Sequence, residues 1–288
     1  MGSNAGYRFV VAACAVLLAA GCASTAHEPD AVAEATVTAP DVAAEASATA
    51  PAARAAAGDV AGRVAAAIAS PARIDADRER DLRDHPQELL TLAGWHEGDR
   101  VADIFGGGGY YSEIIASVVG PSGSVRLINN PPYDGFSKKG REPRLANNRL
   151  PNVSYEVLPP SDMQLGSSTL DGALIVMSYH DLYVVDPKED WPAIDAGQFI
   201  DQIVTALKPG GRLLIVDHQA RAGSGKSDTQ TLHRIEESFA AADFRAHGLE
   251  LVRTLDLLRN PDDDHSKNVF DPAIRGKTDR FVQLYRKP

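Results

Sequence analysis

Histidine and aspartate side chains recur in the second half of the chain at positions where they could do chemistry together. His180 and Asp181 are adjacent, Asp217 and His218 are adjacent, and His265 ends a run of aspartates. A neutral imidazole beside a carboxylate is the usual general base near neutral pH, and the same groups also bind divalent metals. The residues therefore predict a catalytic set of His180, Asp181 and His218. The alternative is a metal site made of His180, Asp217, His218 and His265.

A run of glycines is the second feature that could bind a ligand. Gly106 to Gly109 lie between a predicted strand and a predicted helix that begins near Tyr110. Glycine lets the backbone approach a ligand closely, and the free N–H groups at a helix N-terminus attract a carboxylate. The run therefore predicts a binding loop for an anionic group. A tight turn without a ligand is the alternative.

Alternating strands and helices must position these residues. Apolar runs predict strands over residues 100–105, 124–128, 153–157, 170–177, 212–216, 249–255 and 281–285. Helical spacing predicts helices over residues 60–69, 75–92 (divided near Pro86), 110–119, 199–207 and 229–242. This alternation is typical of a doubly wound α/β sheet, in which ligands bind at the carboxyl ends of the strands.

The predicted topology brings the chemical groups to one edge of the sheet. His180 and His218 follow neighbouring strands, and His233 lies in the first turns of the next helix. His265 lies in the long insertion between the last two strands, which we expect to cover the same edge. His85, His96 and His247 have no such placement and are expected to be structural or exposed.

Two motifs carry a resemblance to a known family. Residues Val101 to Tyr110 resemble the first motif of class I S-adenosylmethionine-dependent methyltransferases, and Leu207 to Leu213 resemble their turn into the fifth strand. The resemblance covers roughly residues 86–286 and is closest to a group of exported predicted methyltransferases. It implies a Rossmann-like, seven-stranded sheet whose last strand is antiparallel. It also implies S-adenosylmethionine as cofactor and methyl transfer to a small-molecule acceptor.

The resemblance assigns roles to residues of the glycine loop. Gly106, Gly107 and Gly109 would hold the methionine end of the cofactor. Asp103, just before the loop, would bind the amino group of that methionine. His180 or Asp181 would then deprotonate or orient the acceptor for in-line attack on the methyl group.

Two positions depart from the family pattern. Phe105 stands where the family usually has its first motif glycine, and Asn129 stands where an acid usually binds the ribose hydroxyls. Asn129 could still hydrogen-bond the cofactor at that position, but without the charge-assisted strength of a carboxylate. Asp162 and Met163 match the adenine-contacting position, although Asp162 would equally cap its own loop. The departures keep open a repurposed fold that binds another ligand, or a divalent metal, through the His and Asp residues.

The segment Asn130 to Tyr133 has the letters of a catalytic motif found in methyltransferases that act on nucleic acid bases. That motif belongs after the fourth strand, whereas this segment follows the second. The formal net charge of -10 also argues against a nucleic-acid partner. We interpret the segment as a proline-rich loop.

The N-terminal region predicts export from the cytoplasm. Arg8, an apolar stretch over residues 9–20 and small residues before Cys22 are typical of a lipoprotein signal peptide over residues 1–22, with Cys22 acylated. An ordinary secretory signal is the alternative. Residues 23–58 are rich in Ala, Thr and Pro and predict a disordered tether, followed by the α/β domain over residues 59–288. We therefore expect a protein of the cell envelope, in the periplasm, held at the membrane only by its lipid.

Overall fold

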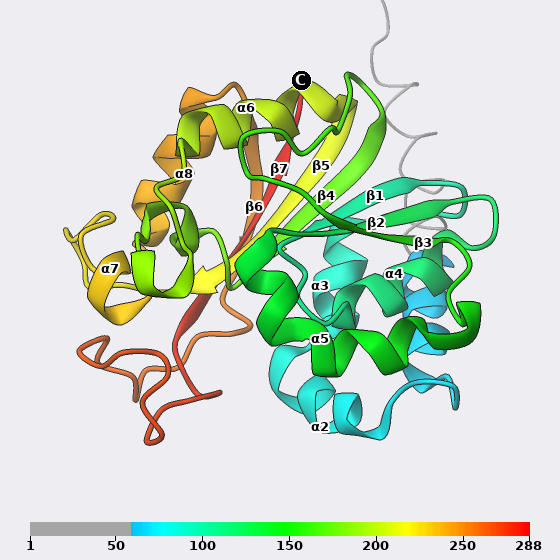
Figure 1. Cartoon of the computed structure of the whole chain (residues 1–288), viewed down its shortest axis with the longest axis horizontal. Coiled ribbons are helices and arrows are strands. Elements are labelled where there is room, and N and C mark those ends of the chain that lie inside the picture. Colours follow the sequence, from blue (N-terminus) through cyan, green and yellow to red (C-terminus); the bar gives the residue numbers. More distant parts are fainter. Residues whose placement is uncertain (1–58) are drawn as a thin grey trace, which may run out of the picture. The chain divides into compact units, whose positions relative to one another are not determined.

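A mixed β-sheet organises residues 59–288, the part of the chain that the computed structural model describes (Figure 1). It has seven strands in the order β3-β2-β1-β4-β5-β7-β6. The strands are β1 Arg100–Ile104, β2 Ser124–Asn129, β3 Val153–Val157, β4 Leu170–Val176, β5 Leu207–His218, β6 Glu250–Leu255 and β7 Arg280–Arg286. β7 pairs antiparallel with β5 and β6, whereas the other neighbours are parallel. The predicted fold class, with its antiparallel last strand, is confirmed.

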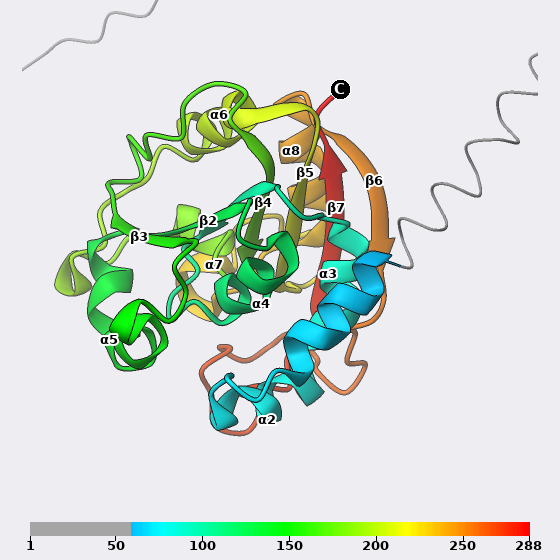
Figure 2. The ribbon, with the colours of Figure 1, turned by 90° about the vertical axis from the view of Figure 1, so that its right-hand side faces the viewer.

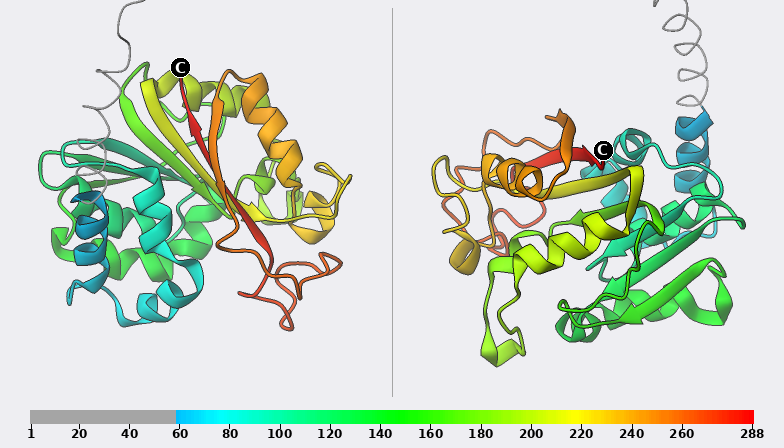
Figure 3. Two further views of the ribbon diagram at one scale, coloured as in Figure 1. Left: turned by 180° about the vertical axis from the view of Figure 1, so that it is seen from behind. Right: turned by 90° about the horizontal axis from the view of Figure 1, so that it is seen from above.

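Helices cover both faces of the sheet (Figures 2 and 3). Residues 59–69 are helical. The remaining helices are α2 Asp75–Asp84, α3 Pro86–Ala93, α4 Tyr110–Val119, α5 Pro131–Leu145, α6 Ala196–Ala206, α7 Thr229–Leu232 and α8 Glu237–Ala246. The predicted division at Pro86 is confirmed, because α2 ends and α3 begins there.

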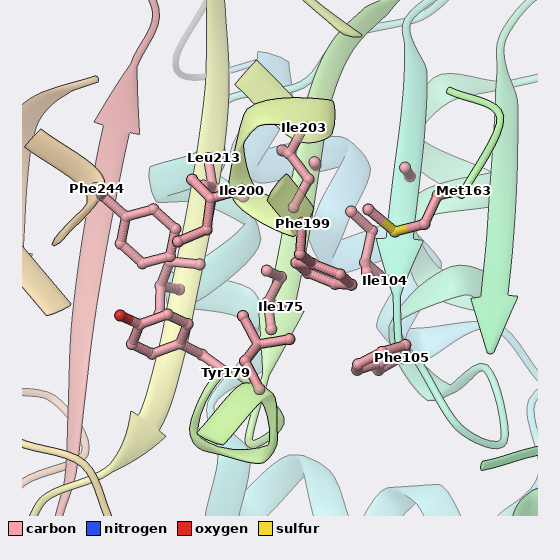
Figure 4. Close-up of a cluster of buried hydrophobic side chains, with 14 of the residues drawn as sticks. Ile104, Phe105, Met163, Ile175, Tyr179, Phe199, Ile200, Ile203, Leu213 and Phe244 are labelled. Carbon is pink, nitrogen blue, oxygen red and sulfur yellow. The ribbon is translucent and has the colours of Figure 1, made fainter. Parts of the chain in front are cut away.

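Alternating side chains of the strands feed two separate cores. Val101 packs with α3 and α4 on one face, whereas its neighbour Ala102 packs with α6 and α8 on the other. The same division continues along β4 and β5, as expected for a sheet buried on both faces. Figure 4 shows the second core, where Phe199 of α6 lies over Ile175 of β4.

Two sequence predictions about helices are wrong. Asn130 to Tyr133 is not a loop but the start of α5, because the Asn130 side chain accepts a hydrogen bond from the Tyr133 backbone N–H at 2.9 Å. The two prolines occupy the first turn, where a missing N–H costs nothing. The single helix expected over residues 229–242 is two helices, since His233 adopts a left-handed φ of 54° and ends α7.

The predicted signal peptide, Cys22 and the predicted tether lie outside the described residues. Among the helices that the structure describes, none combines the length and apolar character needed to cross a bilayer.

Candidate active site

A cavity of about 740 Å³ opens at the carboxyl ends of β1, β4 and β5. Its wall is built from the glycine loop, the segment after β4, the end of β5, α5, and the insertion between β6 and β7. The residues that matter for chemistry are Phe105, Gly106, Gly107, Gly108, Tyr133, His180, Asp181, Trp191, His218 and His233. The structure therefore brings the glycine loop and the predicted catalytic residues His180, Asp181 and His218 to one space.

The conformation of the loop requires glycine at several positions. Gly107 and Gly109 have φ values of 57° and 77°, which side chains rarely adopt. A Cβ atom on Gly106 would lie 2.4 Å from the carboxyl carbon of Asp103. A Cβ atom on Gly107 would meet only the Ser137 side chain, at 4.0 Å. The backbone at Gly107 is therefore the open part of the loop.

Asp103 lies beneath this loop rather than in the cavity wall. Its side chain is buried and accepts a hydrogen bond from the Ser112 hydroxyl at 2.6 Å, near the start of α4. Burial raises the pKa of Asp103 to about 6, although the hydrogen bond from Ser112 opposes that shift. The carboxylate thus supports the loop from below, and its binding of an amino group stays a prediction.

Asn129 is also engaged by the glycine loop. Its side-chain oxygen accepts from the Gly107 N–H at 2.9 Å, and its amide donates to the Gly107 carbonyl at 3.0 Å. The amide also donates to the Ser137 hydroxyl, and the residue is fully buried. The amide of Asn129 is thus engaged by the glycine loop and by Ser137 of α5, and its binding of ribose stays a prediction.

Phe105, which stands where the family usually has a glycine, adopts a left-handed backbone conformation. Its φ is 54°, in the left-handed region that a bulky residue occupies at a cost. The ring is buried, stacked on Tyr133 with centroids 5.1 Å apart, and lies 5.3 Å from Phe199 and 6.4 Å from Trp191 (Figure 4 labels Phe105 and Phe199). The rings of Phe105, Tyr133 and Trp191 form an apolar wall of the cavity, and Phe199 packs against Phe105.

A hydrogen-bonded chain of polar side chains forms the opposite part of the wall. Asp217, at the end of β5, contacts His180 Nδ1 at 2.7 Å. His180 Nε2 lies 3.2 Å from Asp181 Oδ1, and the Tyr133 hydroxyl donates to Asp181 Oδ2 at 2.7 Å. His233 Nδ1 lies 3.5 Å from the same Asp181 Oδ1. Three other segments, which carry Asp217, Tyr133 and His233, therefore converge on the His180–Asp181 pair.

The carboxylates determine the charge of His180. Burial lowers the pKa of His180, but Asp181 and Asp217 outweigh burial and raise that pKa to about 10. His180 is thus an imidazolium at neutral pH, and the catalytic role assigned to His180 or Asp181, to deprotonate or orient the acceptor, stays a prediction. Burial raises the pKa of Asp181, but the His180 charge outweighs burial and holds that pKa far below its ordinary value.

The pKa of His218 is shifted in the opposite direction from that of His180. Burial, with the nearby charge of His180, lowers the pKa of His218 well below its ordinary value. Its Nδ1 atom lies 2.8 Å from the Thr278 hydroxyl. His218 is therefore a neutral imidazole in the cavity wall.

Other predicted site residues lie elsewhere. Asp162 accepts from the Gln164 N–H in its own turn, and Met163 is fully buried in the second core (Figure 4), so neither lines the cavity. His265 Nε2 lies 3.0 Å from Asp279 and is also absent from the cavity wall. The predicted metal set of His180, Asp217, His218 and His265 is therefore not brought together. The insertion does cover the cavity, but through Phe270 and its neighbours.

Comparisons with known proteins agree with this architecture. No protein-family model matches the sequence. The chain is 30% identical over 128 residues to the ubiquinone/menaquinone biosynthesis C-methyltransferase UbiE of Ectopseudomonas mendocina, a match that covers 44% of this chain and 45% of that protein. The chain thus matches less than half the length of that curated relative.

Solved structures show the same fold. A SAM-dependent methyltransferase from Aquifex aeolicus superposes with a TM-score of 0.52 at 17% identity, covering 75% of this chain and 100% of that one. The [4+2]-cyclase SpnF superposes with a TM-score of 0.50 at 18% identity, covering 74% and 82%. The two proteins are named for different reactions, so the reaction has to be argued from the site.

Proposed function

We propose that this chain, which belongs by fold to the class I S-adenosylmethionine-dependent methyltransferases, transfers a methyl group to a small molecule bound in the cavity. One observation carries the proposal. A single space at the carboxyl ends of the strands is lined both by the glycine loop and by His180 and Asp181. The sequence match to a C-methyltransferase supports the same reaction class.

The cavity fits the methionine end of the cofactor better than its ribose. The backbone at Gly107 faces open space, which suits close approach by a ligand. Arg80 also lines the cavity, although it pairs with Asp84, and its guanidinium would attract a carboxylate. Asn129 is engaged by the loop, so the ribose would need other partners. This one departure supports a repurposed fold, but the methyltransferase relatives do not favour that alternative.

When bound, S-adenosylmethionine would supply an electrophilic methyl group on a sulfonium with a good leaving group. The protein would contribute position and electrostatics. The rings of Phe105, Tyr133 and Trp191 offer π-faces that attract a cation. Asp181, held anionic by His180, would accept a hydrogen bond from the acceptor and orient it. His180 is then a positioning residue for Asp181, and His218 stays a neutral contact in the wall.

Replacement of Gly107 by Val tests the placement of the cofactor. The new side chain would occupy the open face of the loop, so we expect calorimetry to detect no binding of S-adenosylmethionine. Gly248→Val is the matched control, because Gly248 has a φ of 85°, has open space around it and does not line the cavity. It should suffer similar backbone strain and keep the affinity of the wild type. Unchanged affinity in folded Gly107→Val would contradict the placement.

A further inference from the structure

We propose that His180, Asp181 and His233 bind a divalent first-row transition metal in the wall of the cavity. Their donor atoms all lie within 4.8 Å of one another. His180 Nε2 is 3.2 Å and His233 Nδ1 is 3.5 Å from Asp181 Oδ1. Ligands at about 2.1 Å from one ion lie roughly 3.0–3.4 Å apart in octahedral or tetrahedral geometry. The two contacts to Asp181 therefore already have nearly the separations of ligands to one ion, and the two histidine nitrogens, which lie within 4.8 Å of each other, would draw closer around it.

Hydrogen bonds behind the donors orient two of the three ligands. His180 places its other ring nitrogen, Nδ1, 2.7 Å from the Asp217 carboxylate. Asp181 uses Oδ2 to accept from the Tyr133 hydroxyl, which leaves Oδ1 directed at both histidines. A metal-binding histidine typically donates its second ring N–H to a carboxylate in this way, and an ion at Nε2 would replace the proton that the imidazolium carries there. The arrangement has the outer partners of a metal site as well as its ligands.

His233 supplies the independent observation that points to a ligand. Its Nδ1 atom is buried, yet it has no hydrogen-bond partner among the described residues. A buried polar atom without a partner destabilises the folded state, so such atoms are rare unless something binds them. The ring is fixed by an edge contact with Phe270, with centroids 4.9 Å apart. A metal ion would satisfy this nitrogen.

The ligand chemistry narrows the choice of metal. Two imidazoles and one carboxylate suit Zn²⁺, Fe²⁺ or Co²⁺ better than Mg²⁺ or Ca²⁺, which prefer oxygen ligands. All three side chains line the cavity, so a bound ion would be accessible to an oxygen of the acceptor. Only this use of the ion rests on the proposed function. The existence of the site does not.

Titration of the purified, chelator-treated protein with Zn²⁺ and Co²⁺ tests the proposal. We expect one equivalent to bind, with visible absorption bands from Co²⁺. His233→Ala should weaken binding at least tenfold. Asp181→Asn, which preserves the shape of the side chain, should do the same if His233→Ala does not fold. His265→Ala is the matched control, because His265 also contacts a carboxylate but lies outside the cavity, and it should bind like the wild type.

Two outcomes would overturn the metal site. One is wild-type protein that is folded and binds neither ion at one equivalent. The other is equal affinity in His233→Ala, Asp181→Asn and His265→Ala. Measuring S-adenosylmethionine binding on the same samples separates the two proposals. Cofactor binding without metal binding would contradict only the proposed metal site. Metal binding without cofactor binding would contradict only the proposed methyl transfer.

Discussion

Phe105 and Asn129 show how single residues depart from the family pattern while the loop keeps its shape. Phe105 adopts the left-handed φ of a glycine, and its buried ring contacts Tyr133 and Phe199. Burial of an aromatic ring contributes several kcal/mol, which outweighs a strain of about 1–2 kcal/mol. Asn129 binds both backbone groups of Gly107. The glycine loop keeps its shape with Phe105 and Asn129 in place. Both residues change which groups around the loop are free to bind a ligand.

Asp103→Asn tests the burial of the carboxyl beneath the loop. The pKa of Asp103 is raised to about 6 from an ordinary value of 3.8, so the folded state holds its proton more tightly than the unfolded state does. The corresponding stability is present below pH 3.8 and is lost as the pH rises through 6. The loss amounts to roughly 3 kcal/mol at most.

Urea unfolding of the wild type and Asp103→Asn at a series of pH values measures this contribution. The difference in free energy of unfolding, variant minus wild type, should increase between pH 4 and pH 6.5, in line with the raised pKa. A difference that is independent of pH would contradict the raised pKa of the buried Asp103 carboxyl.

The helices that are hardest to predict are those whose ends are set by a single capping residue or by a contact with a distant segment. α4 was predicted at its observed bounds, because its apolar spacing and its preceding glycines agree. α5 was not, because prolines suggest a loop, although an asparagine followed by prolines is also a helix start. The break between α7 and α8 depends on the left-handed His233 and on the buried ion pair of Arg234 with Asp263. That pair joins distant segments, so no local pattern reveals it.

α5 packs against the glycine loop, so the stability of this helix affects the loop. Within α5, Arg144 donates to the Gly108 carbonyl at 2.8 Å and pairs with Asp77 and Glu113. Gly140 packs directly against Gly108, with a Cβ on Gly108 lying 3.6 Å from the Gly140 backbone. Loosening the helix should therefore loosen the loop.

Asn130→Ala tests this connection. Loss of the cap of α5 should lower the free energy of unfolding by about 1 kcal/mol and also weaken S-adenosylmethionine binding. Asp195→Ala is the matched control, because it removes the corresponding cap of α6, a helix that does not line the cavity. Thermal unfolding and calorimetry on both variants give the comparison. Equal effects on ligand affinity would show that α5 has no special role.

For the whole molecule, the sequence predicts export to the cell envelope, and the fold gives no reason for that location. The two cysteines, Cys14 and Cys22, both lie in the predicted signal region, so the α/β domain has no disulfide. S-adenosylmethionine is made in the cytoplasm, whereas we propose that this chain works in the envelope. A methyltransferase in the envelope would therefore need a supply of S-adenosylmethionine outside the cytoplasm.

Cys22→Ser tests the lipid anchor. We expect the wild type in the membrane fraction of the producing bacterium, and the variant in the soluble fraction or retained with its signal uncleaved. Cys14→Ser is the matched control, because it changes the other cysteine inside the apolar stretch and should leave the distribution unchanged. Wild-type protein in the soluble fraction, with Cys22→Ser distributed in the same way, would support the ordinary secretory signal instead.

The places where the cavity residues lie in the chain explain which parts of the site could be predicted from the sequence. Strand ends place His180, Asp181 and His218 at one edge, so the topology was sufficient to predict their meeting. The aromatic wall of Phe105, Tyr133 and Trp191 could not be predicted, because its members come from separate segments with no shared motif. The position of His265 depends on the path of a long insertion, which no periodic pattern specifies.

Calorimetric titration of the purified protein with S-adenosylmethionine and its demethylated product tests whether the cavity binds the cofactor that the proposed methyl transfer requires. We expect one equivalent of either ligand to bind in the micromolar range, about 7–8 kcal/mol of binding free energy. A sample that unfolds cooperatively on heating but produces no binding heat with either ligand would contradict the proposed methyl transfer.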